Sequence, residues 1–445
     1  MRVAVVGGGI AGLSAAFHLA AGGAEPVVLE GSPQVGGKVR QARLGDLTVD
    51  VGAEAMLARR PEALDLVRAV GLADDLVAPE PVPAMVFSRG RLRPMPPTVL
   101  GVPADLDALA SSGILAGEVI STPVPVPQHD VSVAEFVAER LGREVVDRLV
   151  EPLLGGVYAG QADRLSLLAA AAPIAALGPD LVEGAARARA AAPVDAGPRL
   201  LGLRGGVGRL VGALVERGGF EVRTQATVRR VRRDADGWEL VVGPTTAAVL
   251  ERFDAIVMAA PAPAAARLLA EAAPRAAFAL AGVDYASMVV VSFLLEGADL
   301  PAGTGFLVPP VESTTIKAAT FSTRKWAWLA EVADSATVVR TSVGRAGETA
   351  LLQRDDASLT EAALADLRAI VEPEGRIGEV AASVVQRWGG GLPQYEVGHL
   401  DVVRRVAEDV ATVPGLEVCG AAYEGVGIAA VVGTARAAAE RILAG

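Results

Sequence analysis

The chain has 445 residues, of which 51% are hydrophobic, and a formal net charge of −11. This length predicts two or three domains with more than one core, and the acidic surplus disfavours nucleic acid as a partner. The single cysteine (Cys419) excludes an intramolecular disulfide and fits a reducing cytoplasm, and three histidines make a metal site unexpected. Because no apolar run is long enough to span a membrane, we expect at most peripheral membrane contact.

The first predicted element is a β-strand over residues 2–6, which runs through a glycine-rich turn into a helix that extends to residue 21. The turn has the pattern GxGxxG, which lets a pyrophosphate approach the backbone amides at the N-terminus of a helix. A second strand, residues 26–29, ends at Glu30, whose carboxylate suits the ribose hydroxyls of a dinucleotide. The cofactor contacts expected here are Gly7, Gly8, Gly9, Ile10, Ala11, Gly12, Glu30 and Gly31.

A second glycine pair and a lysine follow the second strand. Gly37 and Lys38 stand in a segment, residues 32–38, that resembles the second glycine motif of the amine-oxidase-like FAD superfamily. A solvated loop is the alternative on these residues alone, and the resemblance favours FAD over NAD. It also implies a flavin-side loop and a backbone contact with the adenine, at Gly52, Ala53, Glu54, Ala55 and, for the adenine, Val228.

The middle of the chain predicts a helical region and a mixed sheet. The pattern from Ser132 to Glu135 is a capping box, and it begins a helix in a region that reads as mainly helical. Hydrophobic segments with strand-like alternation follow later, with a helix near residues 359–370. The strands expected in this sheet are residues 285–295, 315–321, 337–343 and 380–388.

The C-terminal part returns to the nucleotide domain. A hairpin is expected around Asp236 and Gly237, and a last strand over 416–420 before a long helix. Residues 253–261 resemble the strand of the amine-oxidase-like FAD superfamily that ends in an Ala-Pro turn before a helix. A reduced flavin accumulates negative charge at N1 and the C2 carbonyl, which the N-terminus of a helix can stabilise. The resemblance places the backbone amides of Val426, Gly427 and Ile428 at that position.

The predicted fold class is α/β, with a Rossmann-like FAD-binding domain, a mixed-sheet substrate domain and a helical subdomain. We expect each of the first two domains to be assembled from separate stretches of chain. The FAD-binding domain takes residues 1–57, 200–270 and 412–445, the substrate domain 58–100 and 271–411, and the helical subdomain 101–199.

Several motifs are more specific than the nucleotide fingerprint, because FAD binding alone does not require them. They are residues 91–96 (RLRPMP), 151–160 (EPLLGGVYAG), 163–167 (DRLSL), Trp388 with 393–399 (PQYEVGH), and 423–428 (YEGVGI). Together they resemble the bacterial protoporphyrinogen and coproporphyrinogen oxidases, most closely the Gram-positive coproporphyrinogen III oxidase branch. The resemblance counts Trp388 among the cofactor-side residues.

This resemblance implies a non-covalent FAD that takes hydride from a porphyrinogen in three two-electron steps, with dioxygen as acceptor and peroxide as product. The flavin performs the chemistry, and no catalytic side chain is expected. The implied partners are the porphyrinogen, dioxygen and a downstream haem-synthesis enzyme that could receive the product.

Arg59 and Arg60 are the expected substrate contacts. They precede Pro61, which reads as the first position of a helix, where cations oppose the helix dipole unless an anion lies nearby. A solvated surface pair is the alternative, and the resemblance aligns a substrate-side basic residue with Arg60. Tyr158 and Trp388 are as compatible with core packing as with ring contacts.

Several alternative functions stay open. A protoporphyrinogen IX oxidase belongs to the same family. An amine oxidase or a carotenoid desaturase shares the FAD framework, but an amine oxidase would be expected to show an aromatic cage. A flavin-binding assembly protein without turnover is the alternative outside the enzymes. Reduction of the flavin by a porphyrinogen separates that last class from the others.

Overall fold

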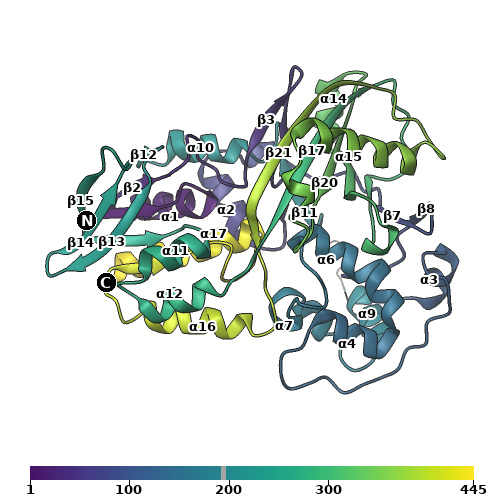
Figure 1. The fold of residues 1–445 in the computed structure, drawn as a ribbon, viewed down its shortest axis with the longest axis horizontal. Helices are drawn as coiled ribbons and strands as arrows, with labels where there is room; N and C mark the ends of the chain where they lie inside the picture. Colours follow the sequence, from purple (N-terminus) through teal and green to yellow (C-terminus); the bar gives the residue numbers. More distant parts are fainter. Residues whose placement is uncertain (192–196) are drawn as a thin grey trace.

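The computed structural model describes residues 1–191 and 197–445, so positions 192–196 of the expected helical subdomain lie outside the described residues. Figure 1 shows three regions, with a nucleotide-type sheet and both termini at the left, a mixed sheet at the upper right and helices at the lower right. No helix among the described residues is long and apolar enough to cross a membrane. The predicted α/β fold class is confirmed.

A five-stranded parallel sheet organises the first region. Its strand order is β12-β2-β1-β16-β22, so strands far apart in sequence pair side by side. The bounds are β1 (Arg2–Val6), β2 (Glu25–Leu29), β12 (Glu221–Arg223), β16 (Ala255–Met258) and β22 (Leu416–Val418). Because every strand is parallel, all carboxyl ends lie at one edge, where ligands bind in sheets of this type.

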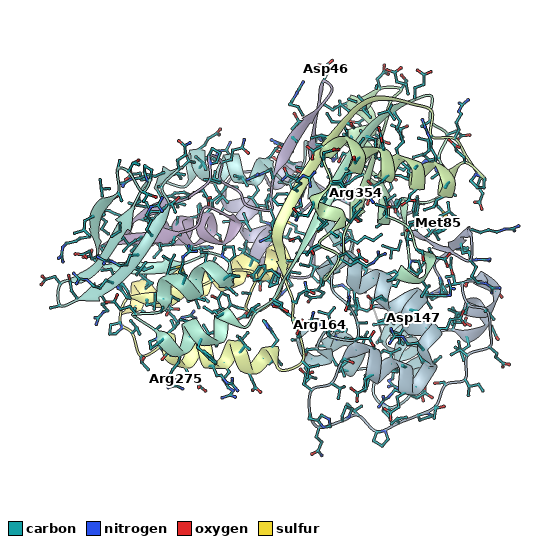
Figure 2. The ribbon with its side chains drawn as sticks, viewed as in Figure 1. Asp46, Met85, Asp147, Arg164, Arg275 and Arg354 are labelled. Carbon is teal, nitrogen blue, oxygen red and sulfur yellow. The ribbon has the colours of Figure 1, made fainter. Side chains whose placement is uncertain are left out.

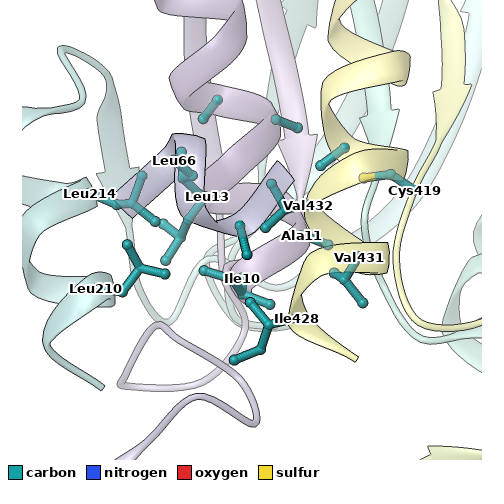
Figure 3. Close-up of a cluster of buried hydrophobic side chains, with 14 of the residues drawn as sticks. Ile10, Ala11, Leu13, Leu66, Leu210, Leu214, Cys419, Ile428, Val431 and Val432 are labelled. Atoms are coloured by element: carbon teal, nitrogen blue, oxygen red, sulfur yellow. The ribbon is translucent and has the colours of Figure 1, made fainter. Parts of the chain in front are cut away.

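Two long helices cover one face of this sheet. α1 (Ile10–Ala21) packs against α17 (Ile428–Ala444), with α2 (Pro61–Ala69) and α10 (Arg209–Arg217) beside them. Figure 3 shows the buried cluster between them, whose members include Leu13, Val432 and Cys419. The packing holds the N-termini of α1 and α17 at the same edge of the sheet.

The other face is covered by a small antiparallel sheet and three helices. β13 (Val228–Asp234) and β14 (Gly237–Val242) form the hairpin that Asp236 and Gly237 predicted. The strand predicted within 253–261 is confirmed as β16, which ends before a turn at Ala259 to Pro261 and a helix. At its start, the Asp254 carboxylate accepts a hydrogen bond from the Arg2 amide at 2.6 Å. The remaining elements are β15 (Val249–Phe253), α11 (Ala262–Leu269), α12 (Pro274–Ala281) and α16 (His399–Val410).

The second region is a seven-stranded mixed sheet of order β21-β17-β20-β19-β18-β7-β8. The four strands expected here are confirmed, and α15 (Asp356–Val371) packs on one face where a helix was predicted. The short strands β7, β8 and β18 of this sheet were not predicted. The bounds are β7 (Met85–Ser88), β8 (Arg91–Pro94), β17 (Tyr285–Glu296), β18 (Gly305–Leu307), β19 (Ile316–Phe321), β20 (Thr337–Val343) and β21 (Glu379–Pro393).

The third region is helical. Ser132 begins α4 as predicted, since its hydroxyl accepts a hydrogen bond from the Glu135 amide at 3.1 Å. A π-helical segment (Val146–Val150) joins α5 to α6. The helices are α3 (Leu106–Ser112), α4 (Val133–Leu141), α5 (Arg143–Val145), α6 (Glu151–Tyr158), α7 (Leu167–Ala170), α8 (Ala172–Ala175) and α9 (Leu181–Ala190).

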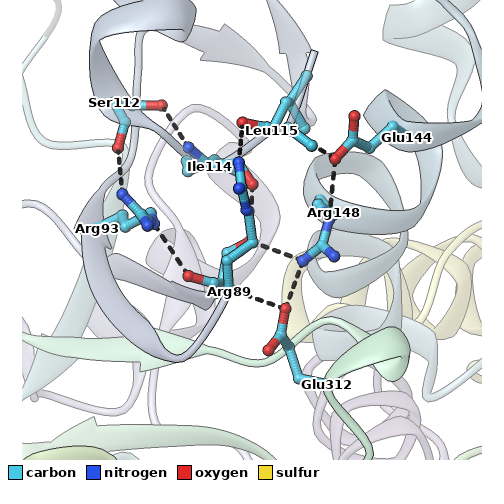
Figure 4. A network of polar contacts seen from close by, with 10 residues as sticks. Arg89, Arg93, Ser112, Ile114, Leu115, Glu144, Arg148 and Glu312 are labelled. Carbon is cyan, nitrogen blue, oxygen red and sulfur yellow. Dashed lines mark hydrogen bonds and ion pairs between the residues drawn. The ribbon is translucent and has the colours of Figure 1, made fainter.

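Polar contacts fix the helical region to the rest of the molecule. Arg148 pairs with Glu312 and donates to the Ser88 hydroxyl at 2.8 Å, as Figure 4 shows for the cluster around it. On the opposite side, Arg164 lies 3.0 Å from Asp284 and 2.6 Å from Glu396. Figure 2 shows Arg164 where the helical region meets the other two.

Candidate functional site

A cavity of about 280 Å³ lies along the carboxyl edge of the parallel sheet. Its walls come from the turns after β1, β2, β16 and β22, and from the starts of α1 and α17. Predicted site residues that line it are Gly7, Gly9, Ile10, Ala11, Glu30, Gly37, Lys38, Ala53, Val426 and Ile428. Predicted site residues outside its lining are Gly8, Gly12, Gly31, Gly52, Glu54, Ala55, Val228, Trp388, Gly427, Arg59 and Arg60.

The N-terminus of α1 opens into this cavity. The first intrahelical bond runs from the Leu13 amide to the Gly9 carbonyl at 3.0 Å, so the amides of Ile10 and Ala11 have no partner within the helix. A Cβ on Gly12 would lie 1.9 Å from the Gly7 carbonyl oxygen, so only glycine lets the helix start this close to the strand. The free amides and the helix dipole together favour a phosphate.

Glu30 stands at one end of the cavity, held by two backbone hydrogen bonds. Its carboxylate accepts from the Gly8 amide at 2.7 Å and from the Ser32 amide at 2.8 Å. The Glu30 carbonyl also accepts from the Ala226 amide at 2.8 Å, which brings the start of β13 near. Val228 itself is buried in the core rather than in the cavity wall. The carboxylate is thus positioned for hydroxyl donors, as a ribose would offer.

Lys38 supplies a cation to the same cavity. It forms no ion pair within residues 1–191 and 197–445, and burial lowers the pKa of its ammonium. The backbone around it is tightly packed, because the Ala53 amide donates to the Lys38 carbonyl at 2.9 Å and a Cβ on Gly52 would lie 1.9 Å from that oxygen. A bound diphosphate would compensate the buried charge.

Two predicted residues join the cavity loop to the mixed sheet. The Glu54 carboxylate pairs with Lys325 and, at 3.0 Å, with Arg340; despite burial, these cations hold the pKa of Glu54 at about 2. Trp388 donates from Nε1 to the Val51 carbonyl at 3.0 Å. Glu54 therefore lines a separate small cavity beside the mixed sheet. Glu54 and Trp388 hold the loop from the side of that sheet.

The start of α17 forms another part of the wall. Gly427 is the N-cap, and its carbonyl accepts from the Val431 amide at 3.0 Å, so the amides of Ile428 to Ala430 have no partner within the helix. Val426 and Ile428 contact the cavity directly. This arrangement offers the positive end of a 17-residue helix to whatever occupies the site.

Several lining residues were not predicted. The turn at Ala259, Ala260 and Pro261 had been singled out in the sequence as a strand end, which could have placed it here. Tyr285 carried no signal, because it begins β17; its hydroxyl accepts from the Ala262 amide at 2.9 Å. The other unpredicted residues are Val39, Cys419, Gly420, Ala421, Ala422, Tyr423 and Val431.

The predicted substrate cations lie outside the described cavities. Arg60 is the N-cap of α2, 42% exposed, with Nε 3.8 Å from the Glu62 carboxylate. Arg59 is exposed beside it. The prediction that Pro61 opens a helix is confirmed, and the role of both arginines stays a prediction.

The donor set of the cavity suits a flavin dinucleotide. The carboxylate suits a ribose, and the free amides together with the ammonium suit a diphosphate. The second helix N-terminus suits a ring that gains negative charge on reduction. The hydroxyl of Tyr423 is buried and has no hydrogen-bond partner among the described residues, so a polar group of the cofactor could pair with it.

Comparison with known proteins agrees with this geometry. Residues 10–443 match the family model described as flavin containing amine oxidoreductase. A coproporphyrinogen III oxidase from Mycobacterium tuberculosis is 36% identical over 453 residues, covering 99% of this chain and 96% of the relative. The corresponding protein of Mycobacterium leprae is 34% identical, covering 99% and 98%.

Solved structures give the same picture. A crystal structure described as a candidate protoporphyrinogen oxidase from Exiguobacterium sp. 255-15 has 31% identity and a TM-score of 0.87, covering 100% of this chain and 98% of its own. Cyclohexylamine oxidase from Brevibacterium oxydans, at 17% identity and a TM-score of 0.69, covers 100% and 98% and shares the fold. The chain therefore belongs to the flavin-containing amine oxidoreductase family and is an FAD-dependent oxidase.

Proposed function

We propose that the chain oxidises coproporphyrinogen III to coproporphyrin III for haem synthesis, with dioxygen as the acceptor. One observation carries the proposal. The motifs at 151–160, 393–399 and 423–428, which FAD binding alone does not require, meet beside the cavity. The Gln394 side chain donates to the Tyr158 carbonyl, and the Tyr395 hydroxyl accepts from the Gly425 amide. The full-length relatives named coproporphyrinogen III oxidase support the same substrate.

Bound FAD would supply hydride acceptance, and the chain's residues would prepare the site. Free amides at α1 and Lys38 would hold the diphosphate, and Glu30 the ribose. The N-terminus of α17 would stabilise negative charge that develops on the ring. Arg60, the N-cap residue of α2, would pair with a propionate of the substrate. The carboxylate at Glu54 is already neutralised by two cations, so we assign it no proton transfer.

The test uses the purified holoprotein. Coproporphyrinogen III added without oxygen should bleach the FAD absorbance, and in air it should give fluorescent coproporphyrin with peroxide. A flavin that stays oxidised with coproporphyrinogen III, but is reduced by a primary amine, would replace this proposal by an amine oxidase. Failure with both substrates would favour the flavin-binding assembly protein.

Protoporphyrinogen IX is the second candidate substrate, favoured by the description of the Exiguobacterium structure. Coproporphyrinogen carries four propionates, and loss of two leaves site cations without partners, which lowers affinity. Parallel assays with both porphyrinogens, with and without lipid, distinguish the two. A higher kcat/KM for protoporphyrinogen IX would reverse our choice.

We also propose the three-part division of the chain stated above, a cytoplasmic site of action and product transfer to a downstream enzyme. The parallel sheet supports the FAD-binding part of this division, because its strands come from 1–57, 200–270 and 412–445. The helices α2, α12 and α16, which the division assigns to the substrate domain, pack against that sheet. With both proteins present, uptake of coproporphyrin by the downstream haem-synthesis enzyme that is faster than its release into solution would support transfer. Equal rates would argue against it.

A further inference from the structure

Residues 393–399 lie behind the cavity rather than in its wall. On one side this segment is fixed to the helical region. The Gln394 side chain donates to the Tyr158 carbonyl at 2.8 Å, and the Ser166 amide donates to the Tyr395 carbonyl at 2.8 Å. The Tyr158 and Tyr395 rings also pack together, with centroids 5.5 Å apart. The segment therefore has a firm support outside the parallel sheet.

On its other side, the Tyr395 hydroxyl bridges the loop that leads into α17. It donates to the Ala421 carbonyl at 2.7 Å and accepts from the Gly425 amide at 2.8 Å. One hydroxyl thus holds both arms of the turn between β22 and the N-cap at Gly427. Because Ala421 lines the cavity, this bridge sets where the helix begins relative to the site.

His399 supports the same loop. Its ring stacks on Tyr395 with centroids 3.9 Å apart and planes 15° from parallel. Its Nε2 lies 3.0 Å from the Ala422 carbonyl, and since a carbonyl oxygen only accepts, Nε2 carries the proton. Burial lowers the pKa of His399 to about 4, so the ring is neutral at physiological pH.

We propose that Tyr395, braced by His399, is a positioning residue that aims the N-terminus of α17 at the flavin. The proposal rests on the proposed function, in which the N-terminus of α17, where Val426 and Ile428 line the cavity, stabilises negative charge on the flavin ring. Tyr395 does not line the cavity, so its effect passes through the turn it holds. The stabilisation that a helix end gives to nearby negative charge falls off within its first turn, so a loosened turn weakens it.

Sulfite binding to the holoprotein tests this without any porphyrinogen. Sulfite adds to N5 of an oxidised flavin and leaves negative charge at N1 and the C2 carbonyl, so its affinity reports on α17. Tyr395→Phe removes one hydrogen-bonding group and should weaken sulfite binding about 3- to 10-fold while FAD remains bound. Tyr158→Phe is the matched control, because its buried hydroxyl makes no hydrogen bond to the loop among the described residues, and it should leave sulfite affinity unchanged.

Equal sulfite affinity in Tyr395→Phe and the unaltered protein would overturn the proposal. If Tyr395→Phe does not retain FAD, the sulfite affinities of His399→Gln and His399→Leu are compared instead. Glutamine restores an Nε2 donor to the Ala422 carbonyl, and leucine does not. We expect His399→Leu to bind sulfite at least threefold more weakly than His399→Gln, and equal affinities would overturn the proposal. Since no porphyrinogen is used, these results do not depend on the identity of the substrate.

Discussion

Lys317 gives the sharpest test of the energetics of this structure. Its side chain is 4% exposed at an irregular position of β19, between the mixed sheet and α6. Desolvation and then the nearby Arg345 lower its pKa from 10.5 to about 7, while Glu348 acts in the opposite direction. Arg345 is also buried, and it interacts electrostatically with the carboxylates of Glu348 and Glu151.

The sign and size of the effect follow from these pKa values. Between pH 7 and 10.5 the unfolded chain binds more protons at Lys317 than the native protein, so stability rises with pH in that window. At about 1.4 kcal/mol per pKa unit, the ammonium costs about 5 kcal/mol of unfolding free energy below pH 7. Of this, about 2.4 kcal/mol is recovered between pH 7 and 9.

Lys317→Met removes the charge and keeps an unbranched stem. We expect its advantage over the unaltered protein to be largest at pH 7 and to shrink by about 2 kcal/mol at pH 9, measured by urea unfolding with saturating FAD at constant ionic strength. Lost packing contacts do not change with pH, so they cancel from this difference. Lys317→Arg stays charged at both pH values, so its unfolding free energy should fall further below that of the unaltered protein as pH rises. A Met advantage that is constant or grows with pH would refute the reasoning.

Three further predictions concern the site. Arg60→Ala should raise the KM for coproporphyrinogen about 2- to 5-fold with kcat nearly unchanged, because a side chain that is 42% exposed forms a screened ion pair. An unchanged KM would place Arg60 outside the substrate site. Glu54→Gln should lower stability above pH 5 by about 1 to 3 kcal/mol, and the difference should vanish as pH falls from about 4.5 towards 2, since the native pKa is depressed. FAD at 100 times its Kd should raise the unfolding free energy of apoprotein by about 2.7 kcal/mol, whereas NAD should not.

The nucleotide end of the cavity could be predicted because its requirements are local. Gly7, Gly12 and Glu30 follow from the geometry of one strand, one turn and one helix, and the pattern is readable within 30 residues. The same holds for the Ser132 cap and for the hairpin at Gly237. Where the physical constraint is contained in neighbouring residues, a single sequence carries it.

The rest depends on contacts between distant segments. Glu54 was expected beside the flavin because residues 52–55 resemble the flavin-side loop of the superfamily, but two cations 271 and 286 residues further along turn its carboxylate to the sheet side. Tyr285 enters the cavity wall only because β17 starts under α11. The motif at 393–399 was recognisable as a pattern, whereas its contact with Ala421 and Gly425 required the fold. Three motifs that are separate in the sequence, 151–160, 393–399 and 423–428, thus contact one another in the fold.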